Sequence, residues 1–359
     1  MRVFLIALYA APLAATTICV LWIMAQSPFA APLVDRSIDQ TRAVLTRAMA
    51  REVDLAWLLP RLQDAILSED LMQLDLLVGL ANDHSVILPA PMVADIAALD
   101  AAASGPVARA TACGACAIDV TACATLGQIG ACALPFELTP AGNVNSLRRA
   151  GVTYLDGGDV DRLDLGLAVI GLGATGAVLA TGGTSYGLKA GTSVLRMARR
   201  LGTLSAPLAA RLGDLVGGAV RWDRMDDLAA LRISPADMIN HANMGELADL
   251  GGSLRRVADK TSVAETVALM RYVDTTQDAA RLARVTDALG PKTRGAFEVL
   301  GKTRAMRAAV RISDIAIGAA VAIYALILQI ATLGAQQCGN ATLRAVRRRT
   351  RRRMRDTSI

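Results

Sequence analysis

Two long apolar segments lie near the ends of the chain, and a long amphipathic stretch separates them. The first, Val3 to Met24, has no charge over 22 residues, which is roughly 33 Å of α-helix. The second, Ile315 to Ala335, lies in a charge-free interval that ends at Arg344. Both segments reach the roughly 20 residues that a helix needs to cross the hydrocarbon core of a bilayer. The pattern therefore predicts two transmembrane helices, within residues 1–26 and 314–336.

A cleaved signal peptide is the alternative explanation of the first segment. Signal peptides usually have an apolar core of about 7–15 residues, which is shorter than this one. The sequence SPFAAP that follows is only a weak match to a cleavage site. We therefore interpret residues 1–26 as an uncleaved N-terminal anchor.

The orientation of the two predicted helices follows from a cluster of arginines in the C-terminal tail, residues 337–359. The eight members are Arg344, Arg347, Arg348, Arg349, Arg351, Arg352, Arg353 and Arg355. Lys and Arg next to membrane segments stay on the cytoplasmic side, where they lie near lipid headgroups. Two spans then place both termini in the cytoplasm. Residues 27–313 would lie in the periplasm of a bacterial cell, with the protein in the inner membrane.

The tail also accounts for the basic character of the protein. The net charge is +6, but the tail with Asp356 contributes +7 and Arg2 contributes +1, so the rest of the chain carries −2. A nearly neutral body has no basic face for nucleic acid, so we expect none as a partner. RNA or anionic lipid could bind the tail itself, but a topology signal at the headgroups is the simpler interpretation.

Helical spacing of apolar residues continues through the predicted periplasmic part. It predicts helices at 34–49, 55–66, 68–80 and 92–103, the third beginning at Ser68 and Glu69. Further along, Ser234 precedes Pro235 at a helix start, and Ser262 with Glu265 forms a capping box. The pattern then predicts a helix at 278–289, stopped by Gly290, and another at 293–311 that leads towards the second span.

Composition supports a mostly α fold. Hydrophobic residues make up 53% of the chain but aromatic residues only 3%, and small aliphatic residues favour closely packed helices. Val152 to Leu155 is the best candidate for a strand. We divide the predicted periplasmic part into helical subdomains at 27–110 and 202–313, a Cys-rich loop at 111–134, and a Gly-rich helical hairpin region at 135–201.

The cysteines favour disulfides over a metal site. Four of the six lie close together in the predicted periplasmic part: Cys113, Cys116, Cys123 and Cys132. An even set in an oxidising compartment is typical of two disulfides, whose pairing the sequence leaves open. Four thiolates could instead bind zinc, or the CxxC could be redox-active, but the spacing lacks the second CxxC of a zinc ribbon. We predict disulfides, with no metal and no cofactor.

A glycine-rich stretch at 171–187, GLGATGAVLATGGTSYG, matches two enzyme motifs. Its first half has the GxGxxG of a dinucleotide-binding turn, but no acidic residue follows about 20 positions on, and no later strands could build the sheet. Its second half has the GxSxG of a hydrolase, with Ser185 as nucleophile and His241 as a possible base. The required strand, oxyanion loop and sheet are missing from the pattern. Both enzyme motifs are weak candidates here.

A pair of helices packed through small residues explains the stretch better. Small residues recur at a spacing of four in two series, which lets two helix backbones approach closely: Gly173, Ala177 and Thr181, and then Gly183, Gly187 and Gly191. Residues 165–188 have no charge, so a third span is an alternative, but it would put the arginine tail outside. We expect a hairpin buried in the periplasmic body, with a break at 181–183. An interfacial or re-entrant hairpin is the alternative.

Residues 138–200 resemble the apolar pre-toxin or linker segments of bacterial polymorphic toxins. The resemblance rests on three runs, LTPAGNVNSLRRAG, DRLDLGLAVIGLGATG and LKAGTSVLRMARR. Such segments show a Pro-x-Gly-Asp turn, a Gly-rich helix pair and a Lys-Ala-Gly helix. Here Asn143 replaces the usual Asp, and no recognisable toxin domain follows. The resemblance implies proximity to a membrane and assigns no catalytic residue.

The sequence thus predicts an anchored periplasmic scaffold that binds another protein or itself, without catalytic chemistry. Membrane lipids are the other predicted partner. One alternative is a membrane-active protein in which the Gly-rich hairpin inserts into the bilayer. A second alternative is a periplasmic serine hydrolase that uses Ser185.

Overall fold

The computed structural model describes residues 31–102, 105–181, 186–230, 232–308 and 327–328. The chain divides into two compact units, one of residues 1–40 with 311–359 and the other of residues 41–310. The first predicted membrane segment and the arginine tail lie outside the described residues, and of the second segment only residues 327–328 are described. Within the described part, no helix combines the length and the apolar character needed to cross a bilayer.

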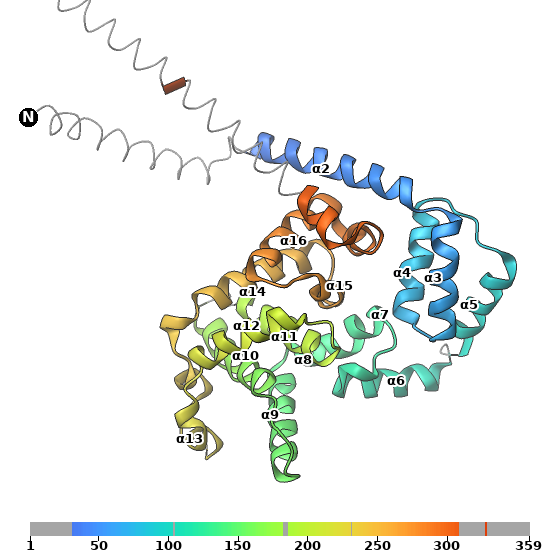
Figure 1. Ribbon diagram of the computed structural model, residues 1–359. Helices are drawn as coiled ribbons and strands as arrows, with labels where there is room; N and C mark the ends of the chain where they lie inside the picture. The colour runs from blue at the N-terminus through green and yellow to red at the C-terminus, as the bar shows by residue number, and fades with distance from the viewer. Residues whose placement is uncertain (1–30, 103–104, 182–185, 231, 309–326, 329–359) are drawn as a thin grey trace, which may run out of the picture. The chain divides into compact units, whose positions relative to one another are not determined.

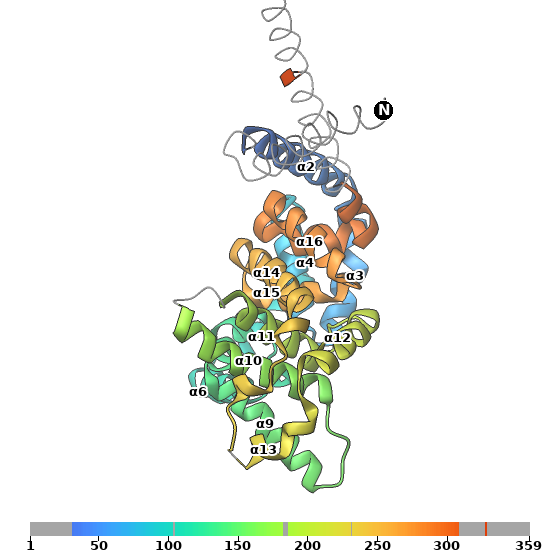
Figure 2. The same cartoon turned by 90° about the vertical axis from the view of Figure 1, so that its left-hand side faces the viewer.

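The described part of the chain is helical and contains no strand (Figures 1 and 2). A single isolated antiparallel bridge joins Val220 and Ile239. The first helices are α2 (Ala31–Glu52), α3 (Leu55–Leu67), α4 (Leu71–Asp83) and α5 (Ala90–Ala102). The prediction of a mostly α fold is therefore confirmed.

The cysteine segment, which we predicted as a loop, consists of short helices. Its elements are α6 (Pro106–Ile118), η2 (Val120–Ala122), α7 (Leu126–Gln128), η3 (Ile129–Ala133) and α8 (Leu134–Glu137). The η2 element is a 3₁₀ turn and η3 is a π-helical turn. Side-chain caps begin two of these turns, since Asp119 accepts a hydrogen bond from the backbone of Thr121, and Thr125 accepts one from that of Gln128.

The remaining elements form the larger part of the unit of residues 41–310. They are α9 (Pro140–Leu155), α10 (Arg162–Thr181), α11 (Tyr186–Arg200), α12 (Ala206–Ala219), η4 (Trp222–Arg224), α13 (Met225–Ala229), η5 (Pro235–Met238), η6 (His241–Asn243), α14 (Gly245–Lys260), α15 (Val263–Leu269), η7 (Met270–Tyr272), α16 (Thr276–Leu289), η8 (Gly290–Lys292) and a helical run at 293–308. Helix α10 packs on α11, α11 on α14, and α14 on α16, so these helices follow one another through the core.

Local capping residues set several of these boundaries. Ser262 accepts a hydrogen bond from the backbone N–H of Glu265 at the start of α15, which is one half of the predicted capping box. The Glu265 carboxylate instead lies 3.5 Å from Arg294. Ser234 and Asp237 form a capping box, but the element that it begins, η5, is only a short 3₁₀ turn. Helix α4 begins at Leu71 rather than at the predicted Ser68. Glu69 there has a φ of 53°, which lies outside the helical region, and Asp70 caps the helix.

One other prediction of secondary structure is wrong, and a second is confirmed with a local irregularity. Val152 to Leu155, the predicted strand, form the last turn of α9, because a four-residue segment without a partner strand does not overcome the helical pattern before it. The predicted helix at 293–311 is confirmed over 293–308, the part that the structure describes. Gly301 has a φ of 74° within this run, so its backbone geometry is locally irregular there.

The first and last described helices of this unit lie side by side. A groove of about 220 Å³ is lined by Val44 and Ala48 of α2 and by Leu300 and Ala308 of the final run. Arg304 pairs with Glu52 of α2 at 2.9 Å. The chain therefore enters and leaves the unit of residues 41–310 at neighbouring points.

Candidate functional site

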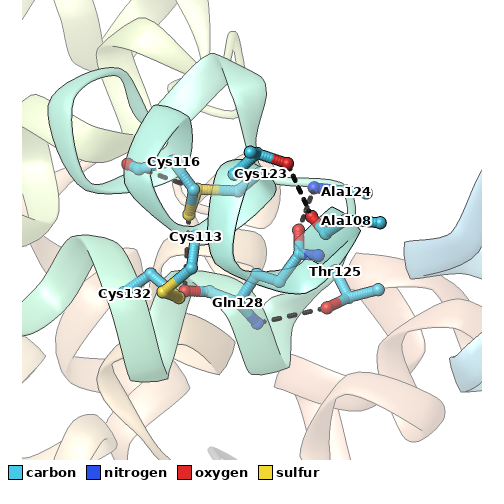
Figure 3. Close-up of a disulfide and its surroundings, with 9 residues drawn as sticks. Ala108, Cys113, Cys116, Cys123, Ala124, Thr125, Gln128 and Cys132 are labelled. Carbon is cyan, nitrogen blue, oxygen red and sulfur yellow. Dashed lines mark hydrogen bonds between the residues drawn. A yellow bond between two sulfur atoms is a disulfide. The ribbon is translucent and has the colours of Figure 1, made fainter. Parts of the chain in front are cut away.

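Two nested disulfides organise the cysteine segment (Figure 3). Cys113 pairs with Cys132, and Cys116 pairs with Cys123, with Cα–Cα distances of 5.3 and 4.7 Å. Cys113 and Cys116 are three residues apart on α6, so they lie on one face of that helix. The predicted disulfides are confirmed, and the structure supplies the pairing that the sequence left open.

The two disulfides differ in exposure. Cys116 is fully buried and Cys123 is 5% exposed, so the inner disulfide belongs to the hydrophobic core. Cys113 and Cys132 are only partly buried. We refer to Cys113–Cys132 as the outer disulfide and to Cys116–Cys123 as the inner disulfide.

The outer disulfide borders an open pocket of about 400 Å³. The residues that line this pocket come from α4, α5, α6 and the turns that follow: Leu71, Asp100, Arg109, Cys113, Thr125, Gly127, Gln128, Ala131 and Cys132. Both partners of the outer disulfide line it, whereas neither cysteine of the inner disulfide does. Gln128 is fixed within it, because its side chain accepts a hydrogen bond from the Ala124 N–H at 2.7 Å (Figure 3).

A second polar centre, a buried ion cluster around Arg196 of α11, lies in the same unit. Arg196 is completely buried and donates to the Glu137 carboxylate and to the Gly142 carbonyl, each at 3.0 Å. The other oxygen of Glu137, itself 2% exposed, accepts from Arg200 at 2.9 Å. Asp164 of α10 lies 3.5 Å from both arginines. The cluster thus ties α8, α9, α10 and α11 together.

Burial dominates the electrostatics of this cluster. Desolvation raises the pKa of the Asp164 carboxyl, although the nearby Arg196 guanidinium acts in the opposite direction. Removing one member of such a buried set leaves its partner charged and unpaired, which is costly. The arrangement is that of a structural centre, since its charged groups pair with each other inside the protein.

The three runs that resemble pre-toxin segments meet at this cluster. Asn143 comes from the first run, Asp164 from the second and Arg196 from the third, and Arg196 donates to the Asn143 side chain. Glu137, Asp164 and Arg196 are not among the residues predicted from the sequence. Arginines within the apolar pattern of VLRMARR are the one local signal that could have drawn attention to them.

The small residues of the Gly-rich hairpin occupy different surroundings. A Cβ atom on Gly191 of α11 would lie only 2.6 Å from the Cα of Gly251 of α14, so the two helix backbones are in close contact there. Gly173 of α10 faces the Ile239 side chain. Ala177 lies in α10 and Gly187 in α11, while Gly183 lies outside the described residues.

The two enzyme motifs do not have the local structure that they require. Residues 162–181 form one helix, so no strand precedes a phosphate-binding turn at Gly171 or a nucleophile at Ser185. Ser185 itself lies outside the described residues. His241 is exposed on the short turn η6. Across the described residues, no group of three or more potential ligand side chains is arranged to bind a metal.

Comparison with known proteins identifies no relative of the chain. No family model, no curated protein and no solved structure matches the chain.

Proposed function

We propose that the protein is an inner-membrane-anchored, periplasmic scaffold with two spans and both termini in the cytoplasm. The observation that carries the proposal is the pair of disulfides inside the folded unit of residues 41–310. Disulfides form and persist in oxidising compartments such as the periplasm. The flanking segments at 3–24 and 315–335 are long and apolar enough to serve as the anchors.

The ends of the folded unit support this arrangement. Val44, early in the unit, and Ala308, near its end, line the same groove. Only a few residues separate Ala308 from the second apolar segment, which begins at Ile315. The chain thus enters and leaves this unit at neighbouring points, which is compatible with two spans in the same bilayer.

The scaffold part of the proposal rests on exposed apolar side chains between residues 67 and 107. Three large apolar side chains there are strongly exposed: Leu67 is 85%, Ile87 is 89% and Val107 is 75% exposed. Covering such side chains with another protein removes apolar area from water and is favourable by about 25 cal/mol per Å². We propose that this part of the surface binds a protein partner or a second copy of the chain.

Site-specific photo-crosslinking in cells tests the interaction. A photoreactive residue at Ile87 or at Val107 is expected to give a discrete protein adduct. The same residue at Ala248, an exposed position on α14, is the matched control and is expected to give none. Ile87→Asp should abolish the adduct formed from Val107.

Three outcomes would contradict the scaffold proposal. They are lipid adducts alone from Ile87 and Val107, equal protein adducts from all three positions, and no adduct from any of them. Lipid adducts alone would favour a membrane-active protein.

A further inference from the structure

We infer that the outer disulfide, Cys113–Cys132, is a site of thiol–disulfide exchange with a thiol-bearing polypeptide. The inner disulfide, Cys116–Cys123, is by contrast structural. The inference goes beyond the scaffold proposal, because it assigns a chemistry to one pocket and does not depend on which protein covers the rest of the surface.

Access distinguishes the two disulfides. Exchange requires a thiolate to reach a sulfur atom directly, so the buried Cys116 and Cys123 are shielded from it. Cys113 and Cys132 line an open pocket of about 400 Å³, which falls within the range of about 300–1,000 Å³ typical of ligand sites. The pocket has room for a cysteine side chain and its neighbours on a polypeptide, and not only for a small reductant.

The charges in the pocket indicate which of the two cysteines is the leaving group when the outer disulfide is attacked. Arg109 and Cys113 are four residues apart on α6, so they lie on the same face of that helix, and both line the pocket. A guanidinium stabilises a nearby thiolate by charge attraction. Cys113 shares its helix face with this cation, so in our proposal Cys113 leaves and Cys132 is the sulfur that is attacked.

The exchange proceeds in two balanced steps. The thiolate of a partner dithiol attacks Cys132 Sγ, the Cys113–Cys132 bond breaks, and Cys113 leaves as a thiolate while a mixed disulfide forms. The second thiol of the partner, after losing its proton, attacks the partner's own sulfur in that mixed disulfide and releases Cys132. Cys113 and Cys132 are each protonated and reduced, and the partner dithiol is oxidised to a disulfide.

Graded reduction of the detergent-solubilised full chain tests the assignment. The probe is dithiothreitol at limiting concentration, with alkylation of new thiols at each time point. All four cysteines fall in one tryptic peptide, Ala110 to Arg148, so fragment spectra of that single peptide assign each label. We expect Cys113 and Cys132 to be labelled at least tenfold faster than Cys116 and Cys123. Equal rates, or faster labelling of the inner disulfide, would overturn the inference.

Two charge variants at the pocket separate exchange from mere exposure. Arg109→Gln is expected to slow labelling of the outer disulfide about two- to fivefold, because the Cys113 thiolate loses its cation. Asp100→Asn is expected to speed it, because the approaching thiolate then meets one negative charge fewer. Both changes in labelling rate should be smaller at high salt, because salt screens the pocket charges. Rates that do not respond to either substitution would contradict the role of the pocket charges.

A peptide dithiol tests whether the site accepts a polypeptide. A short Cys-containing peptide with a second Cys should form a mixed disulfide at Cys132 that is trapped by acid and located by mass spectrometry. A mixed disulfide at Cys113 instead would reverse the assignment of the attacked sulfur. Failure of the peptide to react while dithiothreitol does would show that the pocket admits small thiols alone and would overturn the proposed partner.

Discussion

Replacing Gly191 by Ala tests the closest helix contact in the core. The added Cβ atom would lie 2.6 Å from Gly251 Cα and 3.6 Å from its carbonyl oxygen. Non-bonded carbon atoms prefer a separation of about 3.5–4.0 Å, so the overlap is about 1 Å. The opposing atom belongs to the backbone, and no side-chain rotation relieves the clash. Helices α11 and α14 must therefore move apart.

The expected change in the free energy of unfolding for Gly191→Ala results from two opposing effects. Overpacking of a well-packed core costs about 1–3 kcal/mol. Ala is more favourable than Gly inside a helix by about 1 kcal/mol, which offsets part of that cost. Because the clash involves two backbones, we expect the higher part of the range and a net loss of about 1–2 kcal/mol in the free energy of unfolding.

Gly252 on α14 provides the matched control. It is the next residue after Gly251, and a Cβ atom there would meet nothing within 4 Å. Gly252→Ala is therefore expected to stabilise the protein by about 0.5–1 kcal/mol, through helix propensity and the unfolded chain. The two Gly→Ala substitutions should thus have opposite signs.

Thermal unfolding of the purified full chain in detergent, followed by far-UV circular dichroism, measures both variants. A change of 1 kcal/mol shifts Tm by about 2–4 °C in domains of 150–250 residues, so the difference between the two variants is measurable. A Gly191→Ala variant as stable as the wild type, or two variants that shift Tm in the same direction, would refute the close contact between α11 and α14.

Three further predictions concern the polar centres. Arg196→Met should destabilise the protein by about 3–5 kcal/mol in urea unfolding, because it leaves the buried Glu137 and Asp164 carboxylates with Arg200 as their one shared cation. A loss under about 1 kcal/mol would contradict this. Burial raises the pKa of the Asp164 carboxyl above 3.8, although Arg196 acts in the opposite direction. The folded state therefore favours the protonated carboxyl more than the unfolded state does. The contribution of Asp164 to the free energy of unfolding is full below pH 3.8 and falls as the pH rises through the raised pKa. Asp164→Asn should remove this decrease in stability with rising pH. A variant whose stability has the same pH dependence as the wild type would contradict the raised pKa of Asp164. Cys113→Ser with Cys132→Ser should lower the free energy of unfolding by about 2–3 kcal/mol from loop entropy, measured without reductant. An unchanged urea midpoint would show that the outer disulfide does not stabilise the fold.

Features that depend on neighbouring residues could be predicted from the sequence. The start of α15 follows from Ser262, and the helical spacing at 34–49 and 55–66 closely matches α2 and α3. The start of α4 was misplaced because Ser68 and Asp70 are both good caps, and the positive φ of Glu69 selects the second.

Features that depend on distant residues could not be predicted in this way. The pairing of the cysteines depends on how α6 packs against η3, and three pairings were equally compatible with their spacing. The Arg196 cluster joins Glu137 to Arg196 across 59 residues, and no periodic pattern encodes that contact. Gly191 could be identified as a packing residue, but its partner, Gly251, could not.

The proposed topology places the disulfide-bonded body outside the cytoplasm and the arginine tail inside it. Labelling of single engineered cysteines with a membrane-impermeant maleimide in intact spheroplasts tests this most directly. Ala248→Cys, at an exposed position of the body, is predicted to be labelled in intact spheroplasts, and Thr350→Cys in the tail only after permeabilisation. Labelling of the tail cysteine in intact spheroplasts, with the body cysteine protected until the membrane is opened, would contradict the account.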